Sequence, residues 1–314
     1  MITLKVYGTN GSIPGGNSKT KKELGCNTSC YGIFFEDQAI ILDAGSGLIE
    51  ASKETILRSS RTTDILLSHY HHDHICGFLI APFSYFNPNG TKIKVTGPPF
   101  LREALNAEFG NFVSPGSYQI MRNITELNEA IPGEEFTQGD IQIHAFAAGK
   151  HPLFLSQKYA RRKGGKFYQE FGVLGWNIEI GDAKISYATD MEFDAALNPE
   201  GHVQEFNSIE KKRRELLYLN AIERASILIA DTQYTFEEYP RFKGFGHTYP
   251  ERVMGLAREA GVERVILSHH MPIRTDAEIR KMEHILRRKY PEIDLRFARE
   301  SEELKLEEAI RRTA

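Results

Sequence analysis

Short apolar runs recur along the chain, and glycine, proline, asparagine or charged residues bound each of them. Runs of this kind, with continuous or alternating apolar positions, are typical of β-strands. We expect strands at Ile2–Gly8, Cys30–Phe35, Ala39–Leu42, Ile65–Leu67, Lys92–Thr96, Ile141–Ala147, Gly175–Ile180, Lys184–Ala188, Ile227–Ala230 and Val265–Leu267.

Longer stretches between the strands carry apolar residues every three or four positions, which is the period of an amphipathic helix. We expect helices at Leu48–Ser59, Phe100–Phe109, Ser208–Arg224, Tyr249–Ala260, Asp276–Tyr290 and Glu302–Arg312.

The order of these elements is strands, then a helix, then strands and helices again, and no linker rich in proline, glycine and serine divides them. We therefore expect residues 1–314 to form a single domain of the α+β class, with two sheets packed face to face and helices outside. A dinucleotide-binding sheet is disfavoured, because no G-x-G-x-x-G motif follows a strand at the start of a helix.

The composition restricts the cellular compartment and the binding partners that we expect for this protein. Hydrophobic residues make up 41% of the 314, enough for a sizeable core, and the net charge of −3 argues against nucleic-acid binding over the whole surface. The three cysteines, Cys26, Cys30 and Cys76, are too few for a disulfide framework, so we expect reduced thiols in a cytoplasmic protein. No apolar run approaches the roughly 20 residues of a membrane span, and the first residues read as a strand rather than a signal peptide.

The segment Ser68–His74 is the strongest chemical signal, because it follows an apolar strand and has the spacing His-x-His-x-Asp-His. Clustered imidazoles are costly to bury without partners, and packing does not explain them. Imidazole nitrogens and carboxylate oxygens are ligands that Zn²⁺ prefers. We interpret His69, His71, Asp73 and His74 as metal ligands and His72 as a spacer.

Further histidines and aspartates follow the later strands. Because these residues follow the ends of successive strands, we expect them to lie together at one edge of the sheets as candidate ligands. They are His151, Asp190, Asp231, His247 and His269. The role of His270, which completes a doublet with His269, stays open.

Simpler explanations exist for several of these residues. Asp190 alone fits a turn, and His151 precedes Pro152 and fits an ordinary loop, with His144 as its competitor inside a strand. The segment Thr248–Glu251 matches a capping box, so His247 could simply precede a helix.

The motif His69-x-His71-x-Asp73-His74, followed by His151, Asp190 and His269, resembles the metallo-β-lactamase superfamily. The resemblance implies a four-layer αββα sandwich with a dinuclear metal site at one edge. It implies two divalent ions, Zn²⁺ before Mn²⁺ or Fe. One ion would take His69, His71 and His151, and the other Asp73, His74 and His269. Asp190 would bridge the two.

Three further segments resemble the phosphodiesterase branch, which includes ribonuclease Z and cyclic phosphodiesterases. They are Gly25–Cys30, Leu42–Gly47 and Gly246–Thr248. The branch implies that a metal-bridged hydroxide cleaves a small, cyclic or nucleotide phosphodiester. It implies that Asp231 orients His247 as proton donor and that Asp73 helps to orient the nucleophile.

The alternatives are an RNA 3′-processing endonuclease of the same fold and a thiolester or lactone hydrolase, which should not need His247. Ribonuclease Z carries glutamate where this chain has Asp231. The physiological substrate and the metal used in the cell stay open.

A basic stretch after His151 has two interpretations, a lid over a phosphate or nucleotide backbone and a solvated loop. Its cations are Lys158, Arg161, Arg162, Lys163 and Lys166. We expect a small phosphodiester or nucleotide as the partner, with RNA as the alternative. We also expect a homodimer. The helix at Ser208–Arg224 and the terminal helix could each form its interface or simply be solvated.

Overall fold

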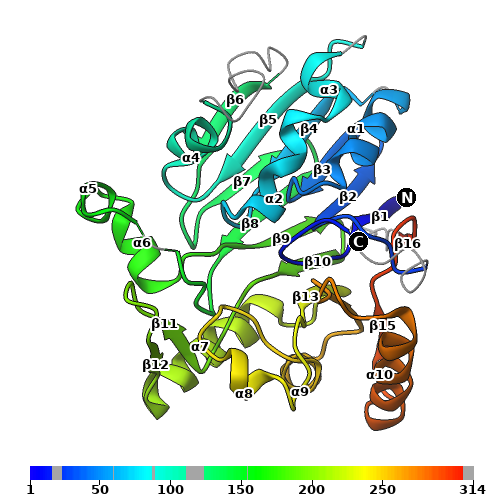
Figure 1. The fold of residues 1–314 in the computed structure, drawn as a ribbon. Helices are drawn as coiled ribbons and strands as arrows, with labels where there is room; N and C mark the ends of the chain where they lie inside the picture. Colours follow the sequence, from blue (N-terminus) through cyan, green and yellow to red (C-terminus); the bar gives the residue numbers. More distant parts are fainter. Residues whose placement is uncertain (16–22, 59, 87–88, 111–123, 154, 307–314) are drawn as a thin grey trace, which may run out of the picture. The chain divides into compact units, whose positions relative to one another are not determined.

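The computed structural model describes residues 1–314 except 16–22, 59, 87–88, 111–123, 154 and 307–314. The chain divides into two compact units, the first made of residues 1–130 with the segment from residue 299, and the second of residues 131–298. Each unit contains a seven-stranded sheet, and the elements are labelled in Figure 1.

The sheet of the first unit has the order β16-β1-β2-β3-β4-β5-β6. Its strands are β1 (Ile2–Gly8), β2 (Cys30–Phe35), β3 (Gln38–Leu42), β4 (Thr62–Leu66), β5 (Lys92–Gly97), β6 (Ile124–Glu129) and β16 (Glu303–Leu306). Pairing is antiparallel from β16 to β3 and parallel from β3 to β6. The sheet is therefore mixed, and the parallel part delivers the ends of β3, β4 and β5 to the same edge.

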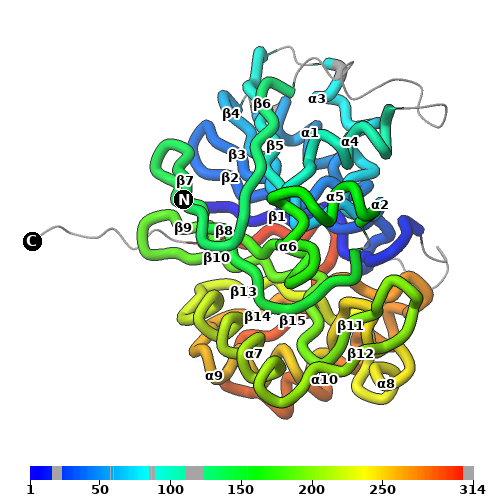
Figure 2. Tube along the Cα trace, turned by 90° about the vertical axis from the view of Figure 1, so that its left-hand side faces the viewer, coloured from blue at the N-terminus to red at the C-terminus, as the bar shows by residue number. Residues whose placement is uncertain are grey.

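Helices cover one face of this sheet, as Figure 2 shows for α1 and α4. The helices of the unit are α1 (Leu48–Leu57), α2 (His72–Ile75), η1 (Cys76–Leu79), α3 (Pro82–Tyr85) and α4 (Leu101–Phe109). Ile41 of β3, Ile65 of β4 and Val95 of β5 point to the same face of the sheet. They pack in one core with Leu48 of α1 and Leu105 of α4. The apolar face of each helix is thus buried against every second strand residue.

The sheet of the second unit has the order β15-β14-β13-β10-β9-β8-β7. Its strands are β7 (Glu135–Gln138), β8 (Ile141–Phe146), β9 (Gly175–Ile180), β10 (Ala183–Ala188), β13 (Ile227–Asp231), β14 (Arg264–Ser268) and β15 (Asp294–Phe297). β7 to β10 form an antiparallel meander, and β10, β13, β14 and β15 pair in parallel. A separate ribbon pairs β11 (Ala195–Leu197) with β12 (Val203–Glu205).

The helices of the second unit are α5 (Gln157–Ala160), α6 (Gly165–Glu170), α7 (Ser208–Ile222), α8 (Tyr239–Phe242), α9 (Pro250–Glu259) and α10 (Asp276–Lys289). Thr275 and Glu278 form a capping box at the start of α10. The capping box expected at Thr248 is absent, because α9 takes Tyr249 as its N-cap and has no side-chain capping bond. Helix capping therefore gives no explanation of the neighbouring His247.

The α+β class and the expected strands are confirmed, but the expected terminal helix at Glu302–Arg312 is wrong over its described part. Residues Glu303–Leu306 form β16, which pairs with β1 from Ile2 to Lys5, and residues 307–312 lie outside the described part of the chain. Leu304 is buried between exposed Glu303 and Lys305, so this short segment follows the two-residue period of a strand.

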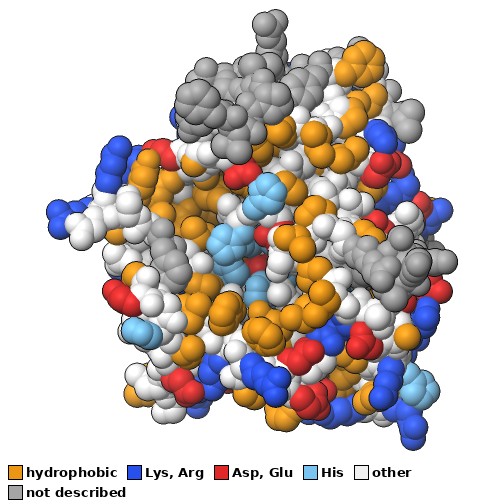
Figure 3. Space-filling model, in the orientation of Figure 1, with side chains coloured by type: hydrophobic (Ala, Val, Ile, Leu, Met, Phe, Trp, Pro, Cys, Tyr) orange, Lys and Arg blue, Asp and Glu red, His pale blue; other side chains and the backbone are white. Residues whose placement is uncertain are grey.

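Charged side chains of both signs intermingle on the surface of the second unit. Figure 3 shows Lys and Arg beside Asp and Glu over the lower part of the face, where α8, α9 and α10 lie. In the described part of the chain, no helix has the length and apolar character needed to cross a bilayer.

Asp64 is a buried carboxylate in the middle of β4. It is paired in register with Ile40 of β3 and Lys94 of β5, but the Lys94 ammonium contacts Glu126 of β6 at 3.2 Å. Burial raises the pKa of Asp64 to about 6, although the Lys94 charge opposes the rise. The folded state therefore binds this proton more tightly than the unfolded chain does.

We expect Asp64→Asn to raise the free energy of unfolding more at pH 7 than at pH 4. In the wild type, the stability that protonated Asp64 contributes falls as the pH rises from about 4 to about 6, because the unfolded chain then releases the proton first. The difference between the two pH values should be about 1–3 kcal/mol in urea unfolding. A difference no larger than that of Asp182→Asn, at an exposed turn position, would contradict this account.

Candidate metal centre

The first unit gathers the histidine motif just after β4. His69 and His71 precede α2, which begins after His71, and Asp73 and His74 lie on α2 itself. The ring centroid of His69 lies 4.7 Å from that of His71 and 4.2 Å from that of His74, and Asp73 Oδ2 lies 3.3 Å from His74 Nε2. The structure therefore brings together all four ligands that the motif predicts in this unit.

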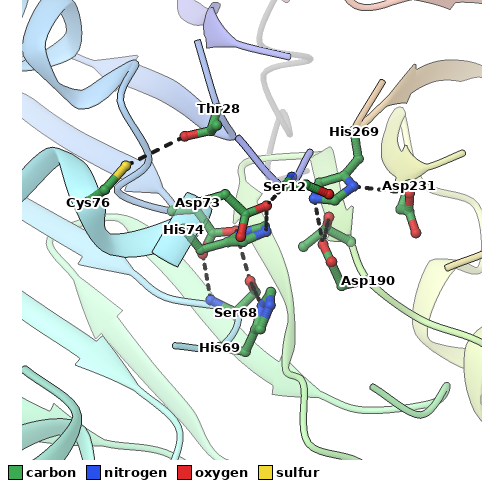
Figure 4. A network of polar contacts seen from close by, with 12 residues as sticks. Ser12, Thr28, Ser68, His69, Asp73, His74, Cys76, Asp190, Asp231 and His269 are labelled. Atoms are coloured by element: carbon green, nitrogen blue, oxygen red, sulfur yellow. Dashed lines mark hydrogen bonds and ion pairs between the residues drawn. The ribbon is translucent and has the colours of Figure 1, made fainter. Parts of the chain in front are cut away.

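Asp43 holds this group from the end of β3 (Figure 4 shows its partners Ser68 and His74). Its carboxylate accepts the backbone N–H of Ser68 at 2.7 Å and the Ser68 hydroxyl at 2.8 Å, and its Oδ2 lies 2.7 Å from His74 Nδ1. Because the Asp43 carboxylate is fully buried and accepts a hydrogen bond from Nδ1, His74 carries its proton there, and its Nε2 is left as the candidate metal-binding atom. Asp73 is also held by the backbone, because the N–H of Ser12 donates to Asp73 Oδ2 at 2.6 Å.

The second unit gathers its candidate ligands at the ends of three neighbouring parallel strands. Asp190 follows β10, Asp231 is the last residue of β13, and His269 follows β14. His269 Nε2 lies 3.4 Å from Asp190 Oδ2, and its Nδ1 lies 3.5 Å from Asp231 Oδ1. Parallel strands bring their carboxyl ends to the same edge, so the sheet itself assembles these residues (Figure 4).

Two histidines from loops complete this cluster. His151 Nδ1 lies 3.9 Å from Asp190 Oδ1, and His247 Nδ1 lies 3.4 Å from the same oxygen and 3.0 Å from Asp231 Oδ2. All of these side chains are buried. Burial alone would raise the pKa of Asp231, but the His247 and His269 imidazoles outweigh burial and hold that pKa at about 2. Asp231 is thus a carboxylate at neutral pH.

The donor chemistry of the second unit fits divalent metal ions. The ligand atoms of His151, Asp190 and His247 lie within 4.8 Å of one another, and so do those of Asp231, His247 and His269. Imidazoles and ionised carboxylates are the ligand types of zinc and of other first-row metals.

Three non-glycine residues at these strand ends have a positive φ. The angles are 58° at Asp43, 55° at Asp190 and 58° at His269. Aspartate tolerates the left-handed region at some cost, and histidine does so less often. The chain accepts this strain where it turns a carboxylate or an imidazole out of a strand.

Glu192 ties the loop of His247 to the rest of the cluster. Its buried carboxylate accepts the backbone N–H groups of Gly244 at 2.7 Å and Gly246 at 2.8 Å and the Tyr239 hydroxyl at 2.8 Å. Its backbone carbonyl accepts the N–H of Lys150 at 2.7 Å, next to His151. Burial raises the pKa of Glu192 to about 7, against the lowering effect of these hydrogen bonds.

Gly246 has no room for a side chain. Its φ is +93°, and a Cβ there would lie 2.1 Å from His151 Nδ1. Its carbonyl oxygen lies 3.3 Å from the same nitrogen, within hydrogen-bond distance. Glu192 and Gly246 therefore act together on the positions of His151 and His247.

The remaining sequence candidates lie outside these clusters. His72 is exposed, and its Nδ1 contacts Glu108 at 2.6 Å. His144 lies on β8 and contacts Glu135 at 3.0 Å. His270 is buried, and its Nε2 lies 3.0 Å from the Ala298 carbonyl oxygen, a packing role between β14 and the segment after β15.

Sequence reasoning assigned no role to Asp43 or Glu192. The signal for Asp43 was present, since it ends a strand in a segment already noted, Leu42–Gly47. Glu192 had only its position two residues after Asp190, which is a weak signal. Their partners become visible only in the folded chain.

Residues 38–270 match the family model described as the beta-lactamase superfamily domain. Ribonuclease Z of Thermoplasma volcanium is 23% identical over 261 residues, which cover 78% of this chain and 82% of that protein.

Two solved structures share the fold. Unliganded yeast PDE1 has a TM-score of 0.64 at 15% identity and covers 97% of this chain and 99% of its own. The metallo-beta-lactamase fold protein YhfI from Bacillus subtilis has a TM-score of 0.62 at 16% identity and covers 96% of this chain and 98% of its own. The expected metallo-β-lactamase fold is confirmed.

We expect Glu192→Gln to loosen the loop that carries His247, because the amide offers one acceptor oxygen and turns a donor toward backbone N–H groups. Hydrogen exchange at the Gly244 and Gly246 amides should accelerate at least about tenfold, and the free energy of unfolding should fall by about 1–3 kcal/mol. Glu259→Gln, at an exposed position at the end of α9, is the matched control. Unchanged exchange at both glycines would show that Glu192 does not hold the loop.

Proposed function

The chain belongs to the beta-lactamase superfamily, and we propose that this hydrolase is a metal-dependent phosphodiesterase for a small, cyclic or nucleotide phosphodiester. The observation that carries the proposal is the buried His247–Asp231 pair beside Asp190. A phosphodiester with a sugar alkoxide as leaving group needs a proton donor. A thiolester does not need one to the same degree, because a thiol has a pKa near 8.5.

Two divalent ions, Zn²⁺ before Mn²⁺ or Fe, fit the donor set of the chain. Their proposed ligands are His69, His71, Asp73, His74, His151, Asp190 and His269. When bound, such ions supply positive charge to phosphate oxygens and lower the pKa of water toward 7.

The protein's own groups set the positions and the proton. Asp231 accepts the Nδ1–H of His247, so His247 presents Nε2 to a leaving oxygen. Ser12 fixes Asp73 through a backbone N–H, which suits a carboxylate that orients the attacking water. Asp43 does the same for His74 through its ring proton.

RNA 3′ processing is the second candidate, because curated relatives of this chain are named ribonuclease Z. Asp231 in place of the glutamate of that family counts against ribonuclease Z itself. We further propose a single functional domain over residues 1–314, acting as a homodimer in the cytoplasm.

The first test is hydrolysis of bis(p-nitrophenyl) phosphate by metal-analysed protein. We expect turnover that falls to background in Asp190→Ala and persists in His144→Ala, a histidine outside both clusters. Protein that holds about two metals per chain but shows no turnover would overturn the phosphodiesterase proposal in favour of thiolester or lactone hydrolysis.

We expect His247→Ala to lower kcat about 10²-fold or more on a cyclic nucleotide that the wild type cleaves, because a sugar alkoxide leaves only with a proton. The loss should be smaller on bis(p-nitrophenyl) phosphate, whose p-nitrophenolate needs no proton to leave. Losses within a few-fold on both substrates, with metal content unchanged, would exclude His247 as the acid.

A further inference from the structure

The second unit contains a cavity of about 340 Å³ that begins beside His151. Leu155, Ala160 and Tyr168, from the segment of α5 and α6, line one side of it. Leu197 of β11 and Phe206 after β12 line the other. This volume is at the lower end of the roughly 300–1,000 Å³ of small-molecule sites.

Two cations line the cavity, Lys150 and Arg214. The Lys150 ammonium donates to the carbonyl oxygens of Tyr168 and of Gln169, the latter at 3.0 Å. Among the residues that the structure describes, no carboxylate lies within ion-pair distance of Lys150. A partly buried ammonium with only carbonyl partners is incompletely compensated, and an anion would stabilise it.

Arg214 is only 4% exposed and is held rigidly. Its guanidinium donates to the Ala148 carbonyl at 3.2 Å and the Glu170 carbonyl at 3.0 Å, and it pairs with Glu210 at 2.7 Å. Among the described residues, its Nε finds no hydrogen-bond partner.

Charge around the cavity is unbalanced toward positive. Glu170 pairs with Arg213, and Glu210 contacts both Arg213 and Arg214, so two carboxylates face three cations when Lys150 is counted. An anionic ligand group beside Lys150 would complete the balance.

The rest of the lining suits a flat organic body. The Arg214 guanidinium lies 4.4 Å from the Phe206 ring centroid, which makes a rigid stacked wall, and Leu153 and Leu197 are apolar. Gln204 offers both a donor and an acceptor to a polar edge. A phosphate joined to a heteroaromatic ring matches this combination better than a simple anion or an uncharged ring does.

We propose that this cavity binds a nucleoside monophosphate group, with the phosphate at Lys150 and the base against Phe206 and Leu197. The assignment rests on the proposed function in one respect, since it makes this group a nucleotide part of the substrate whose phosphate at Lys150 is separate from the diester that is cleaved. The cavity lies next to His151 because Lys150 and Pro152, its neighbours in the sequence, both line it.

Binding of adenosine 5′-monophosphate to chelator-stripped protein, measured by isothermal titration calorimetry, tests the proposal without any turnover. We expect the nucleotide to bind at least about tenfold more tightly than adenosine or inorganic phosphate, and Lys150→Gln to weaken it at least about tenfold. Leu197→Trp should fill the cavity and abolish binding, and it serves as a second variant if Lys150→Gln fails to fold.

Lys184→Gln is the matched control and should leave the affinity within about twofold. Lys184 is also half-buried in this unit, and its ammonium donates to the Glu223 carbonyl at 3.2 Å, but it does not line the cavity. No binding by the wild type, equal affinity for the nucleotide and either fragment, or insensitivity to both cavity variants would overturn the proposal. A protein that binds the nucleotide but cleaves no diester would keep the cavity assignment and contradict the phosphodiesterase.

Discussion

Buried carboxylates that accept the ring protons of buried imidazoles are the interaction on which the candidate site depends. Asp43 does this for His74 in the first unit, and Asp231 does it for His247 in the second. Each pair is buried, so the hydrogen bond fixes both the tautomer and the orientation of the ring. A histidine in such a pair presents Nε2 in one fixed direction. Both metal binding and proton donation require this, and a ring that is free to turn would not provide it.

The parallel strands of each unit position these residues. In each sheet the parallel part brings consecutive strand ends to one edge, where Asp43 stands near the histidine loop and Asp190, Asp231 and His269 stand together. Glu192 positions backbone in a similar way, because its carboxylate accepts hydrogen bonds from the N–H groups of Gly244 and Gly246. The glycines permit turns that other residues would strain.

Much of this arrangement was readable from the sequence. Alternating or continuous apolar runs predicted the central strands, and the spacing around His69 predicted the ligands of the first unit. Strands β6, β7, β11, β12 and β15 were missed, because they are short or carry charged and polar residues in place of the apolar run of a central strand. The terminal strand was mistaken for a helix, since its four residues are too few for a period to stand out beside a charged tail. Asp43 and Glu192 went unassigned because their partners are 25 to 54 residues away and become neighbours only on folding.

The pairing of β16 with β1 has a consequence for biosynthesis. Leu306 lies opposite Ile2, so the edge strand of the first sheet is translated after the whole of residues 131–298. While the ribosome makes residues 131–298, β1 keeps one side of its backbone without that partner, a state open to wrong pairing with other nascent chains. The first unit can therefore complete its sheet only after the second unit has been translated, and chaperone demand should be set by the time that this translation takes.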